Sequence, residues 1–224
     1  MTMKKTIIAL LALAGMASAD YTGDFSWTDG SLPTFTFDDT TDLMLMVDEV
    51  TVDGAVSTAP KTNSVYSGTL TPSTNVGNGG TWSISFAIVN NSTETLTLNG
   101  ITFDAFAYNG GGTAQDADTL TRDITFSLTG AADASVVHSF GNVGDVMNWD
   151  TNPTLTFDAP VEIAAASQVR FDLSVVKSES VGCFIGLSGA TLNTPAAASA
   201  VPEPTTATLS LLALVGLAAR RRRK

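Results

Sequence analysis

The chain has 224 residues, enough for one sizeable domain, and it carries a formal net charge of −11. The charge is uneven, because residues 20–200 hold 21 acidic and four basic residues, a net charge of −17, while the other basic residues gather at both ends. Phosphate binding needs clustered Lys and Arg, so nucleic acid is excluded as a partner of this central segment. Its acidity leaves divalent cations and neutral surfaces as partners, and is also an ordinary means of staying soluble.

Residues 1–19 have the three parts of a secretory signal peptide. Two lysines form a charged start, and the apolar segment after them is too short to span a bilayer. Ala17 and Ala19 then supply the small residues of a signal peptidase site. We therefore predict cleavage after Ala19, with Asp20 as the first residue of the mature chain.

Residues 20–193 are predicted to form an all-β body. Apolar and polar residues alternate with a period of two in its clearest segments, as in strands that bury one face. No segment there shows a convincing helical period. The number of short strands favours a two-sheet antiparallel β-sandwich, jelly-roll-like in its connections. The segments predicted as strands are 34–37, 43–52, 64–71, 82–88, 95–98, 101–103, 124–128, 135–140, 154–157, 169–175 and 184–192.

Asn99-Gly100, between two short alternating segments, predicts a β-hairpin. This pair tolerates the positive φ values that a type I′ turn requires. With a two-residue loop, the apolar residues of 95–98 and 101–103 would share one face, so the turn and the hydrophobic pattern agree.

Few residues offer a catalytic site. The single histidine, His138, alternates with apolar neighbours, which predicts a half-buried side chain rather than a catalytic base. Cys183, the only cysteine, excludes an intramolecular disulfide, and its apolar neighbours predict an inert, buried thiol. Asp104, on a predicted strand, and Asp158 and Glu162, which flank a predicted turn, are candidates for the paired carboxylates of a hydrolase. The separation of such a pair does not follow from the sequence. We predict a non-catalytic body, not an enzyme, with such a hydrolase as an alternative.

Residues 110–119 form a glycine-rich segment that offers a candidate calcium site. It contains an Asp-x-Asp pair, Asp116 and Asp118, and Asp123 lies downstream. Oxygen ligands on a flexible loop are what Ca²⁺ requires, but the Gly and Glu of an EF-hand loop are missing. A solvated acidic loop is therefore the favoured interpretation. No cofactor is predicted, and Ca²⁺ at these three residues stays a candidate.

Aromatic residues in or near predicted loops are candidates for a polysaccharide-binding face, because flat rings stack on sugars. Three Trp and three Tyr are no enrichment for a chain of this size, so packing is the default interpretation. Thr-x-Thr segments begin at Thr34, Thr95, Thr119 and Thr154, and their irregular spacing disfavours an ice-binding array. The aromatic candidates are Trp27, Tyr66, Tyr108 and Trp149.

The C-terminal residues have the features of a membrane-associated tail. Residues 194–200 are small and uncharged, which predicts a linker. An uncharged, mostly apolar segment over 205–219 would span about 22 Å as a helix, against roughly 30 Å of membrane hydrocarbon, so it makes a marginal transmembrane helix. The five cations after it resist translocation, which predicts a cytoplasmic C-terminus and an exported body. They are Arg220, Arg221, Arg222, Arg223 and Lys224.

The tail resembles the PEP-CTERM sorting signal of Gram-negative bacteria. The resemblance lies in Val201-Pro202-Glu203-Pro204, the apolar segment and the basic end, in that order, and it covers only residues 201–224. It implies that a membrane-embedded exosortase recognises Pro202-Glu203-Pro204 and cleaves the tail, leaving the mature protein without a span. The two prolines suit this role, because they fix φ and keep the tetrapeptide from extending the helix.

These segments predict an exported surface or extracellular-matrix protein. Its precursor would be tethered in the inner membrane with the body in the periplasm, and the body would then reach the cell surface or the exterior. The predicted partners are signal peptidase, the exosortase and the inner membrane. Three alternatives stay open: a polysaccharide-binding module, the paired-carboxylate hydrolase, and a protein that keeps its tail as a permanent anchor.

Overall fold

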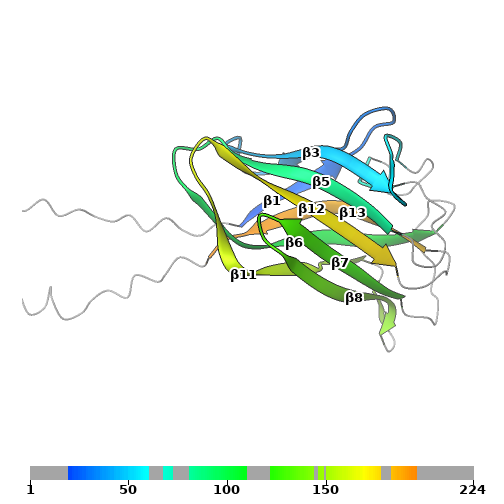
Figure 1. Cartoon of the computed structure of the whole chain (residues 1–224). Helices are drawn as coiled ribbons and strands as arrows, with labels where there is room; N and C mark the ends of the chain where they lie inside the picture. The colour runs from blue at the N-terminus through cyan, green and yellow to red at the C-terminus, as the bar shows by residue number, and fades with distance from the viewer. Residues whose placement is uncertain are drawn as a thin grey trace, which may run out of the picture. The chain divides into compact units, whose positions relative to one another are not determined.

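Every element of regular secondary structure in the described residues is a β-strand (Figure 1). The computed structural model of the chain describes residues 20–60, 68–72, 81–109, 122–143, 146–148, 150–177 and 183–195. Among them, no helix is long and apolar enough to cross a membrane. The predicted signal peptide over 1–19, the predicted span over 205–219 and the linker beyond Pro195 lie outside these residues.

The strands form two antiparallel sheets, which confirms the predicted sandwich. The first sheet has the order β10 (Asp150–Thr151), β6 (Leu96–Asn109), β13 (Cys183–Asn193), β1 (Tyr21–Ser26) and β2 (Thr34–Phe37), and β11 (Thr154–Ile163) also pairs with β6. The second sheet has the order β4 (Ala55–Val56), β3 (Leu43–Val52), β5 (Thr81–Asn90), β12 (Ser167–Lys177), β7 (Arg122–Gly130), β8 (Ala134–Val143) and β9 (Val146–Asn148).

Most strands lie where the alternation of apolar and polar residues predicts them. The predicted segments 34–37 and 43–52 coincide with β2 and β3. Those in β5, β7, β8, β11, β12 and β13 lie inside strands that are longer than predicted. Half of the segment 64–71 lies outside the described residues, and the described half, 68–71, is no strand, although Leu70 forms an isolated bridge with Leu187.

The predicted hairpin at Asn99-Gly100 is wrong. β6 runs through this pair as one strand of 14 residues. Gly100 pairs with Thr156 of β11 on one side and with Asn193 of β13 on the other. A Cβ at Gly100 would lie 2.5 Å from the Leu155 carbonyl oxygen, so glycine is required by the close approach of β11 and not by a turn. Partners on both sides of the strand outweigh the local turn preference.

Four phenylalanine rings link the two sheets through the core. The Phe103 ring of β6 packs edge-on against Phe86 of β5, with centroids 6.5 Å apart. Phe86 stacks on Phe171 of the neighbouring β12, and Phe171 stacks on Phe157 of β11, each pair 5.7 Å apart. This four-ring chain therefore leaves the first sheet, crosses two strands of the second and returns to the first. Aromatic pairs at these distances stabilise a core beyond their burial alone.

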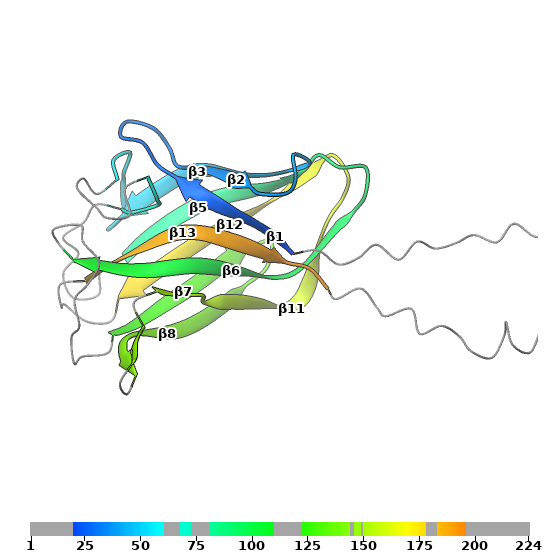
Figure 2. The same cartoon turned by 180° about the vertical axis from the view of Figure 1, so that it is seen from behind.

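The first and last strands of the described body lie side by side. β1 pairs antiparallel with β13, from Tyr21 opposite Leu192 to Asp24 opposite Gly189 (Figure 2). The Thr194 backbone N–H donates to the Asp20 carboxylate at 2.9 Å, which extends the pairing beyond both strands. The two ends of the body are thus fixed to each other.

A buried amide closes the sandwich beside the β5–β6 connection. Asn90 is fully buried, and its Nδ2 donates to the carbonyl oxygens of Glu94 at 2.8 Å and Ile163 at 2.9 Å. Its Oδ1 accepts from the Ser92 backbone N–H at 3.1 Å and from the Ser92 hydroxyl at 2.6 Å. One side chain thereby ties the end of β5 to the connection and to the end of β11.

We expect Asn90→Ala to destabilise the body by about 1–3 kcal/mol, because it leaves buried carbonyl groups without a donor. The measurement is chemical denaturation, with Asn91→Ala as the matched control at the exposed neighbouring position. Equal losses of stability in the two variants would contradict the role given to the Asn90 amide.

Candidate functional site

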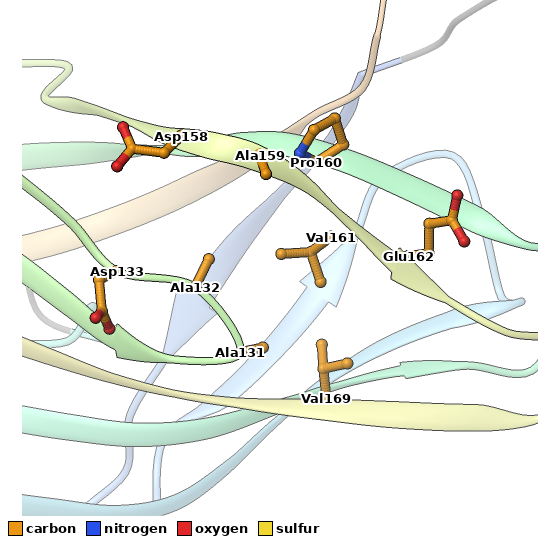
Figure 3. A pocket seen from close by; sticks show the side chains of 9 residues that line it. All are labelled: Ala131, Ala132, Asp133, Asp158, Ala159, Pro160, Val161, Glu162 and Val169. Atoms are coloured by element: carbon orange, nitrogen blue, oxygen red, sulfur yellow. The ribbon is translucent and has the colours of Figure 1, made fainter.

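A cleft of about 590 Å³ lies where β11 departs from its partner strand (Figure 3). Thr156 pairs with Gly100 and Val161 pairs with Leu98, so residues 157–160 of β11 face a single residue of β6. Pro160 within this bulge has no N–H to donate to a ladder. The bulge therefore separates the strand locally from its sheet. We call the resulting space the bulge cleft; it is lined by Ala131, Ala132, Asp133, Asp158, Ala159, Pro160, Val161, Glu162 and Val169.

The bulge cleft has an apolar floor and an acidic rim. Val161 of β11 and Val169 of β12 point toward each other across it (Figure 3). Asp133 comes from the β7–β8 connection, and Asp158 and Glu162 come from opposite ends of the bulge; all three are exposed. No basic side chain is among the lining residues.

Arg170, which follows Val169 in β12, lies on the outer face of the second sheet. It forms an ion pair there with Asp48 of β3. Successive residues of a strand alternate between faces, so the cleft receives Val169 and not the guanidinium group. The negative charge of the rim is therefore not balanced by the Arg170 guanidinium group.

Two of the three predicted hydrolase carboxylates lie in this cleft, and the third does not. The expectation that Asp158 and Glu162 flank a turn is wrong, because both lie within β11 on either side of its bulge. Sequence reasoning missed Asp133, since only the position of the β7–β8 connection brings it beside them. Asp104 is on the strand β6, as expected, but on the outer face of the first sheet.

Asp104 faces another carboxylate there. A Cβ at Gly189 of β13 would lie 2.9 Å from Asp104 Oδ2 and 3.1 Å from Asp24 Oδ1 of β1, so the two acids converge above the glycine. Burial raises the pKa of the Asp104 carboxyl above its ordinary value, and the nearby Asp24 raises it further. The pair makes the ionised form of Asp104 costly in the folded state.

His138 lies on β8 and is half-buried on the same side as Val136, which confirms the prediction from alternation. Its Nε2 forms a hydrogen bond with the Thr151 hydroxyl of β10, so it links the second sheet to the first. Burial lowers the pKa of the imidazole. This position at the edge of the sandwich gives His138 a structural role.

Only one of the three candidate calcium ligands lies among the described residues. Asp116 and Asp118 lie outside them. Asp123 of β7 is exposed, and its Oδ1 accepts from the Ser139 hydroxyl of β8 at 2.5 Å. Within the described ranges, no group of three His, Cys, Asp or Glu residues could hold a metal ion. Ca²⁺ therefore stays a candidate for the part of the chain around Asp116.

Two of the predicted aromatic binding residues belong to the interior. Trp27 is 2% exposed, and its Nε1 donates to the Ser31 carbonyl oxygen at 2.8 Å. Tyr108 is fully buried, its hydroxyl donates to the Pro72 carbonyl oxygen at 2.9 Å, and its ring stacks on Phe184. Burial raises the pKa of Tyr108. The default interpretation of packing is thus confirmed for these two rings, while Tyr66 and Trp149 lie outside the described residues.

In the described residues the Thr-x-Thr segments do not form a common row, but Thr154, which begins one of them, lies in a row with threonines of other segments. The register places four of them next to one another across the outer face of the first sheet: Thr154, Thr102, Thr191 and Thr22. Their hydroxyl groups pair at 2.9 Å between Thr102 and Thr154 and at 3.1 Å between Thr22 and Thr191. These residues come from distant segments, so no spacing in the sequence indicates the row.

Of the remaining predicted site residues, Asp20 is described, and the others lie outside the described residues or have side chains that are not described. The sorting residues Val201, Pro202, Glu203 and Pro204, the cations 220–224, and Ala17 and Ala19 are outside. Cys183 begins β13, and its side chain is not described. Asp20 is described, and it accepts the hydrogen bond from Thr194.

Residues 200–224 match the family model of the PEP-CTERM protein-sorting motif, which confirms the resemblance of the tail. No curated protein matches the chain.

Three solved structures resemble the chain at low scores. TmCBM61, solved in complex with beta-1,4-galactotriose, is 10% identical, with 69% of this chain and 90% of that chain covered and a TM-score of 0.34. CBM35 from Cellvibrio japonicus Abf62 is 15% identical, with 68% and 94% covered and a TM-score of 0.32. The catalytic domain of GH87 alpha-1,3-glucanase, as a D1069A variant in complex with tetrasaccharides, is 12% identical, with 74% and 30% covered and a TM-score of 0.30. Such scores say nothing about ligand or activity.

We expect Asp104→Asn to raise the melting temperature at neutral pH, because it removes a buried charge and its repulsion with Asp24. The folded-state pKa of Asp104 is raised, so its cost is present at neutral pH and disappears as pH falls below the ordinary value of 3.8. The increase in melting temperature caused by Asp104→Asn should therefore become smaller in melting curves recorded at decreasing pH. Asp39→Asn, at an exposed position, is the control with the same change of charge.

We also expect Trp27→Phe to destabilise the body more than Trp82→Phe. Both indoles are buried, but Trp27 Nε1 has a partner, whereas Trp82 Nε1 has none among the described residues. The first variant therefore loses a hydrogen bond and leaves the Ser31 carbonyl unpaired, whereas the second removes an unpaired buried donor. Denaturation curves of the two variants give the comparison, and the reverse order would refute it.

Proposed function

We propose that this chain is an exported protein sorted by an exosortase, whose mature part is a non-catalytic surface or extracellular-matrix domain. The observation that carries the proposal is the match of residues 200–224 to the PEP-CTERM sorting motif. An N-terminal segment with the features of a signal peptide supports export independently.

The processing order follows from the two ends of the chain. Signal peptidase cuts after Ala19, and the five terminal cations hold the tail on the cytoplasmic side while 205–219 lies in the inner membrane. Exosortase then cleaves near Val201–Pro204. A span of 15 residues suits temporary retention, because it is shorter than the hydrocarbon core it must cross. The product is a body without a membrane anchor, at the cell surface or outside the cell.

The described body divides the three hydrolase candidates between two places, which supports a binding or structural role only for the arrangement that includes Asp104. Asp104 and the pair of Asp158 and Glu162 belong to different places in the fold, on the sheet face and in the bulge cleft. The chain passes from β5 in the second sheet to β6 in the first, and from β11 to β12 to β13 between the sheets, an alternation that favours a jelly-roll classification. Domains of this architecture often act as lectins or capsid proteins.

Polysaccharide binding is the second candidate function, and the bulge cleft favours it. Its volume falls within the range of ligand sites in proteins, and its lining combines apolar side chains with a few acidic groups. The candidate binding site is therefore the bulge cleft, and not the aromatic residues that the sequence suggested.

Replacing Pro202-Glu203-Pro204 with three alanines should leave a membrane-retained precursor with an intact tail, because the residues that the exosortase recognises are gone. Fractionation and mass spectrometry of the C-terminus in the native bacterium measure the outcome. Pro195→Ala is the control, a proline change outside the motif, and should be processed normally. Normal cleavage of the triple variant would refute exosortase sorting.

A further inference from the structure

The bulge cleft separates its charges along an apolar surface. Asp133 and Asp158 lie toward one end and Glu162 toward the other, with Val161 and Val169 between them (Figure 3). An apolar floor favours a ligand with hydrophobic surface, and the rim favours positive charge. The two requirements together describe a ligand that carries several cationic groups on a partly apolar backbone.

A single metal ion does not meet this description. Within the described residues, no group of three acidic or other metal-ligating side chains could hold one. The rim acids are also exposed, so each is in contact with water and accessible to a separate charged group. Cationic groups spaced along a polymer fit carboxylates that are spaced along a cleft.

A basic peptide is disfavoured by the backbone of β11. An extended peptide binds a strand edge through main-chain hydrogen bonds. At the cleft, the ladder of β11 is interrupted over 157–160, and Pro160 lacks an N–H. Sugar rings need no such ladder, since they contact a protein through their apolar C–H faces and their substituents.

We propose that the bulge cleft binds an amino-sugar polysaccharide, a linear polymer of hexosamines whose amino groups are free and protonated. The ammonium groups lie against Asp133, Asp158 and Glu162, and the ring faces rest on Val161, Val169 and Pro160. This proposal adds a binding partner to the surface or matrix role proposed above. It rests on that role only because the body must be exported to meet the polymer. A body net charge of −17 adds long-range attraction for a polycation.

The test is calorimetric titration of the full-length chain in detergent with a short β-1,4-glucosamine oligomer and with its N-acetylated counterpart. The two probes share a backbone and differ in charge. The glucosamine oligomer should bind, more weakly as salt rises, and the N-acetylated oligomer should bind at least about tenfold more weakly. Equal binding of both, or binding of neither, would overturn the proposal, whereas processing of the tail in cells would be unaffected.

Three variants locate the binding. Asp133→Asn/Asp158→Asn/Glu162→Gln should weaken glucosamine binding about tenfold, the size expected when three exposed charge pairs are lost together. Asp29→Asn/Asp38→Asn/Asp39→Asn, at exposed positions on or beside the loops around β2, makes the same change in net charge and should bind normally. Ala132→Trp fills the cleft without changing charge, so it should also weaken binding and serves if the first variant does not fold. Equal weakening in both triple variants, or tighter binding of a lysine-rich peptide than of the oligomer, would refute the assignment.

Discussion

The packing of four phenylalanine rings between the two sheets is the contact on which the rest of the body depends. Phe86 and Phe171 come from adjacent strands of one sheet, and Phe103 and Phe157 come from the other. Phe157 is also the first of the four residues of β11 that leave the β6 ladder. The ring holds β11 against the core on one side of the bulge, and buried Val161 holds it on the other. A cleft can therefore open at the surface without loosening the sandwich beneath it.

The polar groups that close the sandwich are few and specific. Asn90 satisfies the backbone where β5, the following connection and β11 meet, and His138 joins β8 to β10. The outer faces carry hydroxyl groups that pair with one another, as between Thr102 and Thr154. Residues 20–200 carry 21 acidic and four basic residues, so the body is predominantly acidic while the tail is strongly basic. The sorting signal and the body therefore differ in the sign of their charge.

Alternation of apolar and polar residues was enough to predict β2, β3 and the centres of six other strands, because each buries one face. The sequence could not reveal that Asn99-Gly100 lies in mid-strand, since β11 and β13, which hold it there, come more than fifty residues later. The bulge cleft could not be predicted for the same reason, because segments that are far apart in the chain form it. Asp158 and Glu162 were recognisable as acids near each other, but Asp133 joins them only because the β7–β8 connection lies beside the bulge of β11. Trp27 is a loop residue, as its neighbours indicate, but its burial and its hydrogen bond to Ser31 do not follow from them.

The pairing of β1 with β13 has a consequence for the timing of folding. A chain exported from its N-terminus delivers β1 first, and there the strand has only the four-residue β2 beside it. The middle of the first sheet stays incomplete until residues 183–193 are available to pair, because β13 lies between β1 and β6. Such distant pairings make folding slow and expose strand edges meanwhile. A tail that pauses in the membrane would hold the newly arrived β13 close to its partners, giving the body time to close before it is released.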